Sequence, residues 1–219
     1  LRIAALGFAG GRAPRAQATV AAVYYIDPYV RTTEDIVKES NPAPLKLVQP
    51  RPRPENKRVW ASLKQSKAEI FTSIASEMVR RDPEHKKTWV CVMDGDRALR
   101  RVARTILGAV GTFILILDLY HALEYLWEAA YALHGRDGSE AKEWCTMQLR
   151  RILAGEVSTV ARGMRQSATK RGLKKSDREP VDRAAGYFLS IKDSMKYHEY
   201  IAAGLPIGSG VAEGSVKNL

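Results

Sequence analysis

The stretch from Thr88 to His121 constrains the fold of this chain more than any other. It holds two apolar runs, Trp89–Met93 and Phe113–Leu117, and an aspartate, Asp94 or Asp118, directly follows each run. Between the runs, apolar residues recur every three or four positions, which predicts a helix. Short apolar runs on both sides of an amphipathic helix are typical of a βαβ unit with buried parallel strands. We therefore expect both aspartates at the sheet edge where open α/β folds place their chemistry.

The segment before these two strands predicts further pieces of an α/β core. Residues 1–15 show no convincing periodicity, whereas Gln17–Ile26 has the β-branched and aromatic residues of a strand. A proline-rich linker with five prolines runs from Asn41 to Pro54. Ser66 and Glu69 have the spacing of a capping box, which predicts that a helix begins there.

After His121 the pattern becomes helical throughout. Helices are expected within residues 122–134, 139–153, 157–170, 177–191 and 192–203. A glycine-rich turn over residues 204–210 then leads into a new helix that begins at Val211. We expect an α/β core over residues 1–121, an all-α insertion over 122–203, and a return to the core over 204–219.

Three acidic residues, Asp94, Asp118 and Glu213, are grouped as the candidate chemical site. Carboxylates that converge at strand ends and at a helix start can hold Mg²⁺, which prefers oxygen ligands. Two such ions can activate a water and stabilise the leaving oxygen in phosphodiester chemistry. The alternative for Asp94 and Asp118 is that each only caps the helix that follows it.

The spacing of Asp118 and His121 lets the two side chains approach across one helical turn. In that case Asp118 can fix the tautomer of His121, or His121 can reach DNA or the active-site edge. A purely structural pair is the other interpretation of the same spacing.

The chain carries 35 Lys and Arg against 24 Asp and Glu among its 219 residues, a formal net charge of +11. This excess indicates either a polyanionic partner such as nucleic acid or a merely basic protein. Arg162 and Arg165 are candidates for contacts with phosphates, whereas a series of arginines from Arg97 to Arg104 is interpreted as a solvated helix face. The stronger DNA-binding candidates lie in an expected inter-helix loop and are Lys170, Arg171, Lys174 and Lys175.

Two further observations concern the compartment. No apolar run approaches the roughly 18 residues that a membrane span requires, so no membrane partner is expected. The two cysteines, Cys91 and Cys145, lack metal-ligand spacing. They are interpreted as buried thiols of a reducing compartment, which predicts a cytoplasmic location.

Several segments together resemble the Kra-type (ISKra) insertion-sequence transposases of bacteria, a family of DDE transposases. The matching segments, which extend over about residues 16–219, are AAVYYIDPYVRTTEDIV, RPRPENKRVWASL, RRDPEHKKTWVCVMDGDRAL, ILDLYHALEYLWEAAYALHG, ATKRGLK and YIAAGLPIGSGVAEGSVKNL. The spacing of Asp118 and His121 is also similar to a pattern in Mutator-like transposases. The resemblance implies a ribonuclease-H-like core with an all-α insertion and a location at the bacterial nucleoid.

The same resemblance implies Mg²⁺- or Mn²⁺-dependent cleavage and strand transfer at transposon ends. Asp94 corresponds to the second acid of the triad and Glu213 to the third, and both are implied metal ligands. Asp118 and His121 correspond to supporting residues. The implied partners are the double-stranded DNA of transposon ends and target, and further copies of the chain in a homo-oligomer.

The first acid of the triad has no counterpart, because residues 1–15 contain no Asp or Glu. We therefore expect a core without its first strand, in a chain that is truncated at both ends and inactive alone. The alternative is a non-enzymatic, basic DNA-binding remnant that interferes with an intact transposase. A ribonuclease-H-like nuclease of another kind is a further alternative.

Overall fold

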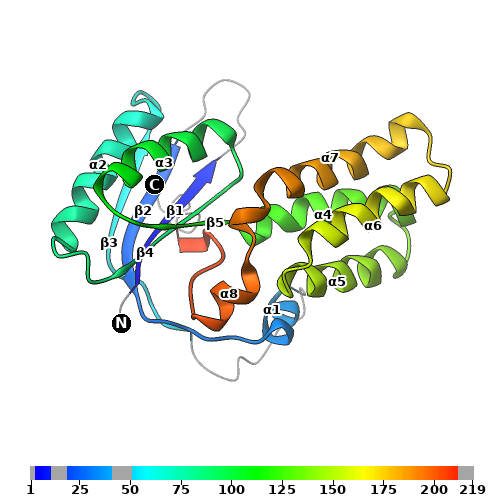
Figure 1. Cartoon of the computed structure of the whole chain (residues 1–219), viewed down its shortest axis with the longest axis horizontal. Coiled ribbons are helices and arrows are strands. Elements are labelled where there is room, and N and C mark those ends of the chain that lie inside the picture. The colour runs from blue at the N-terminus through cyan, green and yellow to red at the C-terminus, as the bar shows by residue number, and fades with distance from the viewer. Residues whose placement is uncertain (1–2, 11–18, 41–50, 212–219) are drawn as a thin grey trace. The chain divides into compact units, whose positions relative to one another are not determined.

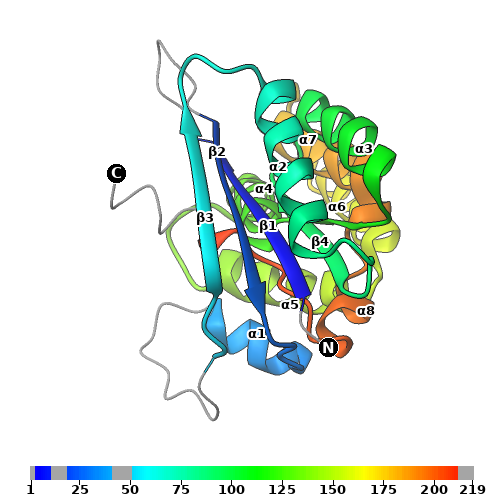
Figure 2. The same cartoon turned by 90° about the vertical axis from the view of Figure 1, so that its left-hand side faces the viewer.

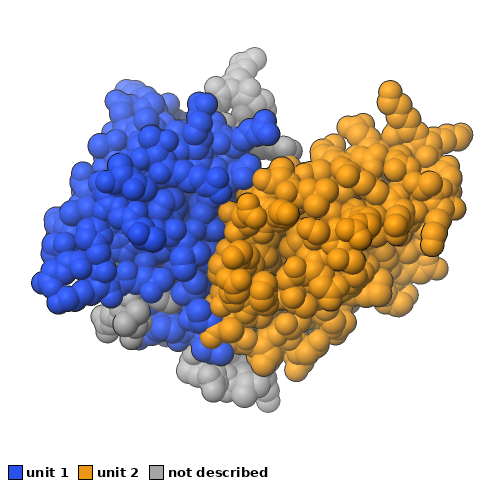
Figure 3. Space-filling model, viewed as in Figure 1, with its two compact units in different colours: residues 1–30, 49–118, 203–219 blue, residues 31–48, 119–202 orange. Residues whose placement is uncertain are grey.

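The computed structural model describes residues 3–10, 19–40 and 51–211. The chain divides into two compact units, which Figure 3 colours separately. We call the first, which comprises residues 1–30, 49–118 and 203–219, the sheet unit. We call the second, which comprises residues 31–48 and 119–202, the helical unit. The chain is therefore of mixed α/β class.

The sheet unit contains one sheet whose strand order is β3-β2-β1-β4-β5. The elements of this unit are β1 (Ile3–Gly10), β2 (Thr19–Ile26), β3 (Glu55–Ser62), α2 (Lys67–Arg81), β4 (Thr88–Met93), α3 (Arg97–Val110) and β5 (Ile114–Leu117). Strands β1, β2 and β3 pair antiparallel, whereas β4 runs parallel to both β1 and β5. The predicted βαβ unit of β4, α3 and β5 is confirmed.

Helices α2 and α3 lie on the same face of the sheet (Figure 2) and share one apolar core with it. From α3 the buried residues are Leu99, Ala103 and Leu107, which recur at helical spacing. Along β4 every residue from Trp89 to Met93 is buried, as expected for a central parallel strand. The arginines of α3 lie off this apolar stripe: Arg97, Arg101 and Arg104 are exposed, and Arg100 is half-buried.

The predicted helix start at Ser66 is confirmed in atomic detail. The Ser66 hydroxyl oxygen accepts a hydrogen bond from the Glu69 backbone N–H (3.2 Å), and the Glu69 carboxylate accepts one from the Ser66 backbone N–H (2.7 Å). These reciprocal bonds satisfy two backbone donors that a helix start leaves without a partner inside the helix.

The expectation that the first strand is missing is wrong. Residues Ile3–Gly10 form β1, which lies at the centre of the sheet between β2 and β4. Its sequence, IAALGFAG, is rich in Ala and Gly, which have weak β-propensity, and therefore gave no clear strand signal. Pairing with both neighbouring strands overrides this weak local preference, so the sheet has a first strand but one without an acidic residue.

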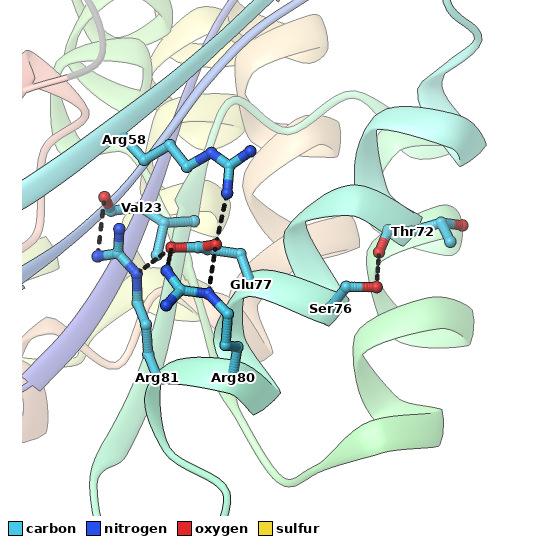
Figure 4. Close-up of polar contacts among 7 residues, drawn as sticks. All are labelled: Val23, Arg58, Thr72, Ser76, Glu77, Arg80 and Arg81. Atoms are coloured by element: carbon cyan, nitrogen blue, oxygen red, sulfur yellow. Dashed lines mark hydrogen bonds and ion pairs between the residues drawn. The ribbon is translucent and has the colours of Figure 1, made fainter.

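A buried glutamate, Glu77, ties α2 to the sheet (Figure 4). Its carboxylate accepts hydrogen bonds from Arg58 Nη1 on β3 (2.7 Å), from Arg80 Nη2 (2.7 Å) and from Arg81 Nε (2.5 Å). Arg81 in turn donates to the backbone oxygen of Val23 on β2 (3.4 Å). Burial alone would raise the pKa of Glu77, but these hydrogen bonds and charges outweigh it and hold the pKa at about 2.

The helical unit has no strand in its described residues. Its elements are α1 (Thr33–Glu39), α4 (Leu119–His134), α5 (Glu140–Leu153), α6 (Val157–Lys170), α7 (Lys175–Ile191), a 3₁₀ turn (Lys192–Ser194) and α8 (Tyr197–Ala202). Helix α4 packs against α5 and α7, and α6 packs against α7 (Figure 1). The prediction that residues 122–203 are almost wholly helical is confirmed.

Helix α1 belongs to the helical unit although the sequence analysis grouped its residues with the core. It packs on α5, and Arg150 of α5 pairs with Glu34 through two hydrogen bonds of 2.8 and 3.1 Å. The chain thus enters the helical unit twice, once at α1 and once at α4.

Candidate functional site

The two aspartates that follow β4 and β5 lie at the same edge of the sheet, as predicted. Met93 and Leu117 are partners in the parallel ladder, so Asp94 and Asp118 follow directly at neighbouring strand ends. The backbone N–H of Asp118 donates to the Met93 oxygen (2.8 Å), which continues the ladder to its last residue. Both positions are set by the buried strands that precede them.

Asp118 is a buried hydrogen-bond acceptor, with 3% of its surface exposed. Its Oδ2 accepts from the backbone N–H of Ser209 (2.9 Å) and from the Ser209 hydroxyl, and Ser209 is itself buried. The nearby Tyr24 has a raised pKa because it is buried and because the charge of Asp118 adds to the effect of burial. Asp118 therefore holds the glycine-flanked Ser209 at the end of β5.

Asp94 has a different environment, because it is half-buried and makes a local turn. Its Oδ1 accepts a hydrogen bond from the Asp96 backbone N–H (3.2 Å). The N-cap of α3 is Asp96, whose carboxylate accepts from the Leu99 N–H (2.6 Å) and pairs with Lys67 Nζ (3.0 Å). The alternative that Asp94 caps α3 is wrong, since Asp96 performs that task.

Glu213 lies outside the described residues, which end at Val211. The segment that leads toward it, however, is held at the sheet edge through Ser209. Within the described residues there is no group of three or more His, Cys, Asp and Glu side chains placed to hold a metal ion. Of the two predicted metal ligands, the structure therefore describes Asp94 alone.

Strand β1 pairs with β4, the strand that Asp94 follows, and contains no acidic residue. Gly7 pairs with Val92 in the parallel register. Continued by two residues on each strand, this register puts Ala9 beside Asp94. In a parallel sheet, residues in register share a face, so position 9 is where an acid on β1 would lie next to Asp94.

His121 lies on α4 in the helical unit and contacts other residues of that unit. Its Nδ1 is 3.2 Å from Glu124 Oε2. Its ring makes edge-on contacts with Tyr125 (centroids 5.4 Å apart) and with Tyr187 of α7 (5.8 Å), and these two tyrosines stack on each other at 4.1 Å. The sequence analysis did not predict either Glu124 or Tyr187 as a contact of His121. Glu124 could have been predicted, because residues three apart on a helix are neighbours.

The predicted DNA-binding residues surround the short connection between α6 and α7. Lys170 is the last residue of α6, Arg171 and Lys174 lie in the connection, and Lys175 is the first residue of α7; all four are exposed. Arg171 Nη2 lies 3.3 Å from His134 Nδ1.

Lys170 also borders a groove along the outer face of α6, which we call the α6 groove. The groove has a volume of about 760 Å³ and is lined by Ser158, Arg162, Arg165, Gln166, Thr169, Lys170 and Leu189. Arg162 and Arg165 were recognised from the sequence. Lys170 was also named from the sequence, and the remaining lining residues of α6 follow from the helical spacing of these arginines, whereas Leu189 of α7 does not.

Comparison with protein-family models, with curated proteins and with solved structures gave no match. In the described part of the chain, no helix has the length and apolar character needed to cross a membrane.

Proposed function

We propose that this chain is a DNA-binding protein of the DDE transposase class, of the Kra-type family that its sequence resembles. The observation that carries the proposal is the sheet edge at which Asp94 and Asp118 lie side by side in a β3-β2-β1-β4-β5 sheet. Three antiparallel strands followed by two parallel ones are the arrangement of ribonuclease-H-like cores, so the fold supports the resemblance by analogy.

The acidic residues at this edge take different roles in the proposal. Asp94 is the candidate metal ligand, because it is half-buried and, among the described residues, accepts only a local hydrogen bond of 3.2 Å from the Asp96 N–H. Asp118 is a positioning residue, since the buried Ser209 donates two hydrogen bonds to its Oδ2. Glu213 joins Asp94 as the third acid of the triad by resemblance alone.

The described residues do not form a complete site for two Mg²⁺ ions. Such ions require several oxygen ligands in near-octahedral geometry, and among the described residues only Asp94 is a candidate ligand at this edge. The bound metal would supply the Lewis-acid chemistry of phosphodiester cleavage.

A second candidate function is that of a non-enzymatic DNA-binding remnant, which can interfere with an intact transposase by pairing with it. The observation that favours it is β1, which is present in the sheet and pairs with β4 up to Val92 but contains no acidic residue. Loss of one ligand disturbs both in-line positioning and charge stabilisation, and each of these contributes strongly to catalysis. We therefore expect DNA binding without cleavage.

The two candidates are separated by a nicking assay on supercoiled plasmid and on a duplex that carries transposon-end repeats. The chain as given is expected to shift the DNA in a gel but to leave it uncut with Mg²⁺ or Mn²⁺. Cleavage that is lost in Asp94→Asn would show that another acid completes the site, and would favour the enzyme. Failure to bind either DNA would contradict both candidates.

A further inference from the structure

The α6 groove is a strongly basic feature of the helical unit. The chain reaches α7 from α6 through a short connection, and the two helices pack side by side (Figure 1). All but one of the lining residues come from α6, and Leu189 of α7 is the exception. The groove therefore follows the axis of one helix.

Helical periodicity explains how α6 can serve both the core and the groove. The buried residues of α6 are Val157, Val160, Ala161, Met164 and Ala168. The groove residues of α6 lie on the opposite face, at positions 158, 162, 165, 166, 169 and 170. Ser158 and Lys170 are twelve residues apart, which corresponds to roughly 18 Å along the helix axis at about 1.5 Å per residue. A DNA strand rises about 3.4 Å per nucleotide, so this length corresponds to about five nucleotides.

The chemistry of the lining fits a phosphate backbone. Three lining residues are cationic, three are neutral and polar, one is apolar, and none is acidic. Arg165 approaches Asp182 at 3.8 Å, whereas Arg162 and Lys170 make no ion pair within the described residues. Guanidinium, ammonium, hydroxyl and amide groups are the side chains that contact DNA phosphates. A groove that lacks acids over this length has the charge complementary to a polyanion.

We propose that the α6 groove binds the sugar–phosphate backbone of DNA and positions it independently of sequence. The inference rests on the proposed function only in taking DNA as the partner. The sequence analysis named Arg162, Arg165 and Lys170 separately, and the structure brings them together in one groove. The other predicted DNA-binding residues, Arg171, Lys174 and Lys175, do not line it. Arg162 and Arg165 are the central contacts and Lys170 borders the groove at one end.

The test compares two variants of the full chain that each lose three positive charges from the helical unit. The groove variant is Arg162→Ala, Arg165→Ala, Lys170→Ala. The control is Lys38→Ala, Lys142→Ala, Lys196→Ala, whose exposed lysines lie on α1, on α5 and just before α8. Binding to two unrelated 20-base-pair duplexes is measured by fluorescence anisotropy over a range of NaCl concentrations. Circular dichroism of all three proteins establishes that they fold alike.

The groove variant is expected to bind both duplexes at least tenfold more weakly than the parent chain. The slope of the logarithm of the association constant against the logarithm of the salt concentration should fall in magnitude by up to about 2.7. Each lost phosphate contact reduces the slope by about 0.9. The control should keep nearly the parent slope, since its lysines lie elsewhere.

Equal behaviour of the two variants would overturn the proposal for the groove while leaving DNA binding by the chain intact. If the parent chain shows no salt-dependent DNA binding, both the groove and the proposed function fail. A groove variant that loses affinity for only one of the two duplexes would contradict sequence-independent backbone binding. The variant Arg162→Lys, Arg165→Lys keeps both charges and should retain most of the affinity.

Discussion

At the scale of single residues, the sheet unit depends on two buried carboxylates that are satisfied in different ways. Glu77 is neutralised by arginines, whereas Asp118 accepts hydrogen bonds from Ser209. A buried charge without a partner is far more costly than an exposed one. Removing either set of partners should therefore change stability measurably.

The hydroxyl of Ser209 is predicted to stabilise the sheet unit. Ser209→Ala removes the side-chain donor to Asp118 and leaves the backbone donor in place. The expected loss is about 1–3 kcal/mol in the free energy of unfolding, because a buried carboxylate loses a hydrogen bond. Chemical denaturation followed by Trp fluorescence measures it. Ser190→Ala, which removes an exposed hydroxyl bonded to the Tyr187 oxygen, is the matched control. Equal destabilisation by both changes would contradict the prediction.

The Glu77 cluster predicts a loss of stability in acid. Because the folded pKa of about 2 lies below the ordinary value of 4.5, the stabilisation is present in full above pH 4.5. It should decline as the pH falls from about 4.5 toward 2, and the total is on the order of 3 kcal/mol. Glu77→Gln should lower stability at pH 7 and flatten this acid dependence in urea titrations. An unchanged acid profile in Glu77→Gln would show that other carboxylates dominate it.

At the scale of secondary-structure elements, the central position of β1 makes the missing acid testable. Ala9→Asp introduces a carboxylate at the position on β1 that would lie opposite Asp94 if the β1–β4 register, which ends at Gly7 and Val92, continued by two residues. A second oxygen ligand should raise the affinity for Mn²⁺ or Mg²⁺ at least tenfold, or about 1.4 kcal/mol. Isothermal titration calorimetry measures the change.

Two further variants test whether charge and position cause that gain. Ala9→Asn has nearly the same shape as Ala9→Asp without the charge, so it should show little gain. Adding Asp94→Asn to Ala9→Asp should return the affinity to the parent value. A gain that survives Asp94→Asn would mean that the new carboxylate binds the ion without Asp94.

The elements that could be predicted from sequence are those with a strong local signal. Apolar runs identified β4 and β5, and the Ser66–Glu69 spacing located the start of α2. Strand β3 has a weaker local signal, because it follows a proline-rich segment and begins with the polar residues Glu55–Arg58. Strand β1 was missed because its small residues form a strand through pairing with neighbours rather than by propensity.

The candidate site was predictable to a smaller extent. Strand periodicity put Asp94 and Asp118 at one edge, since parallel strands end together. The partner of Asp118 was not predictable, because Ser209 is 91 residues away in sequence. Likewise, only the structure distinguishes Asp94 from Asp96 as the cap of α3, because both have suitable side chains.

At the scale of the whole molecule, the net charge of +11 predicts binding to DNA that depends steeply on salt. With six to ten phosphate contacts, affinity should fall about 10³- to 10⁵-fold between 50 and 200 mM salt.

The variant in which Lys170, Arg171, Lys174 and Lys175 are all Ala should show a weaker salt dependence, with the slope of log affinity against log salt reduced by up to about 3.6. Gel-shift titrations at several salt concentrations measure both. If Arg171→Ala, Lys174→Ala, Lys175→Ala keeps the parent slope, the connection makes no contact of its own and Lys170 acts through the groove.

The hydrogen bond between Asp118 and Ser209 is a noncovalent contact that closes a loop of about ninety residues. Closing a loop of this length lowers the conformational entropy of the chain, but this loss grows only with the logarithm of the loop length. A shorter loop should therefore change the entropy of closure little. Replacing both parts of the helical unit, residues 31–48 and 119–202, by short Gly-Ser tethers tests this. The sheet unit is then expected to unfold cooperatively in urea, and loss of a cooperative transition would contradict the expectation.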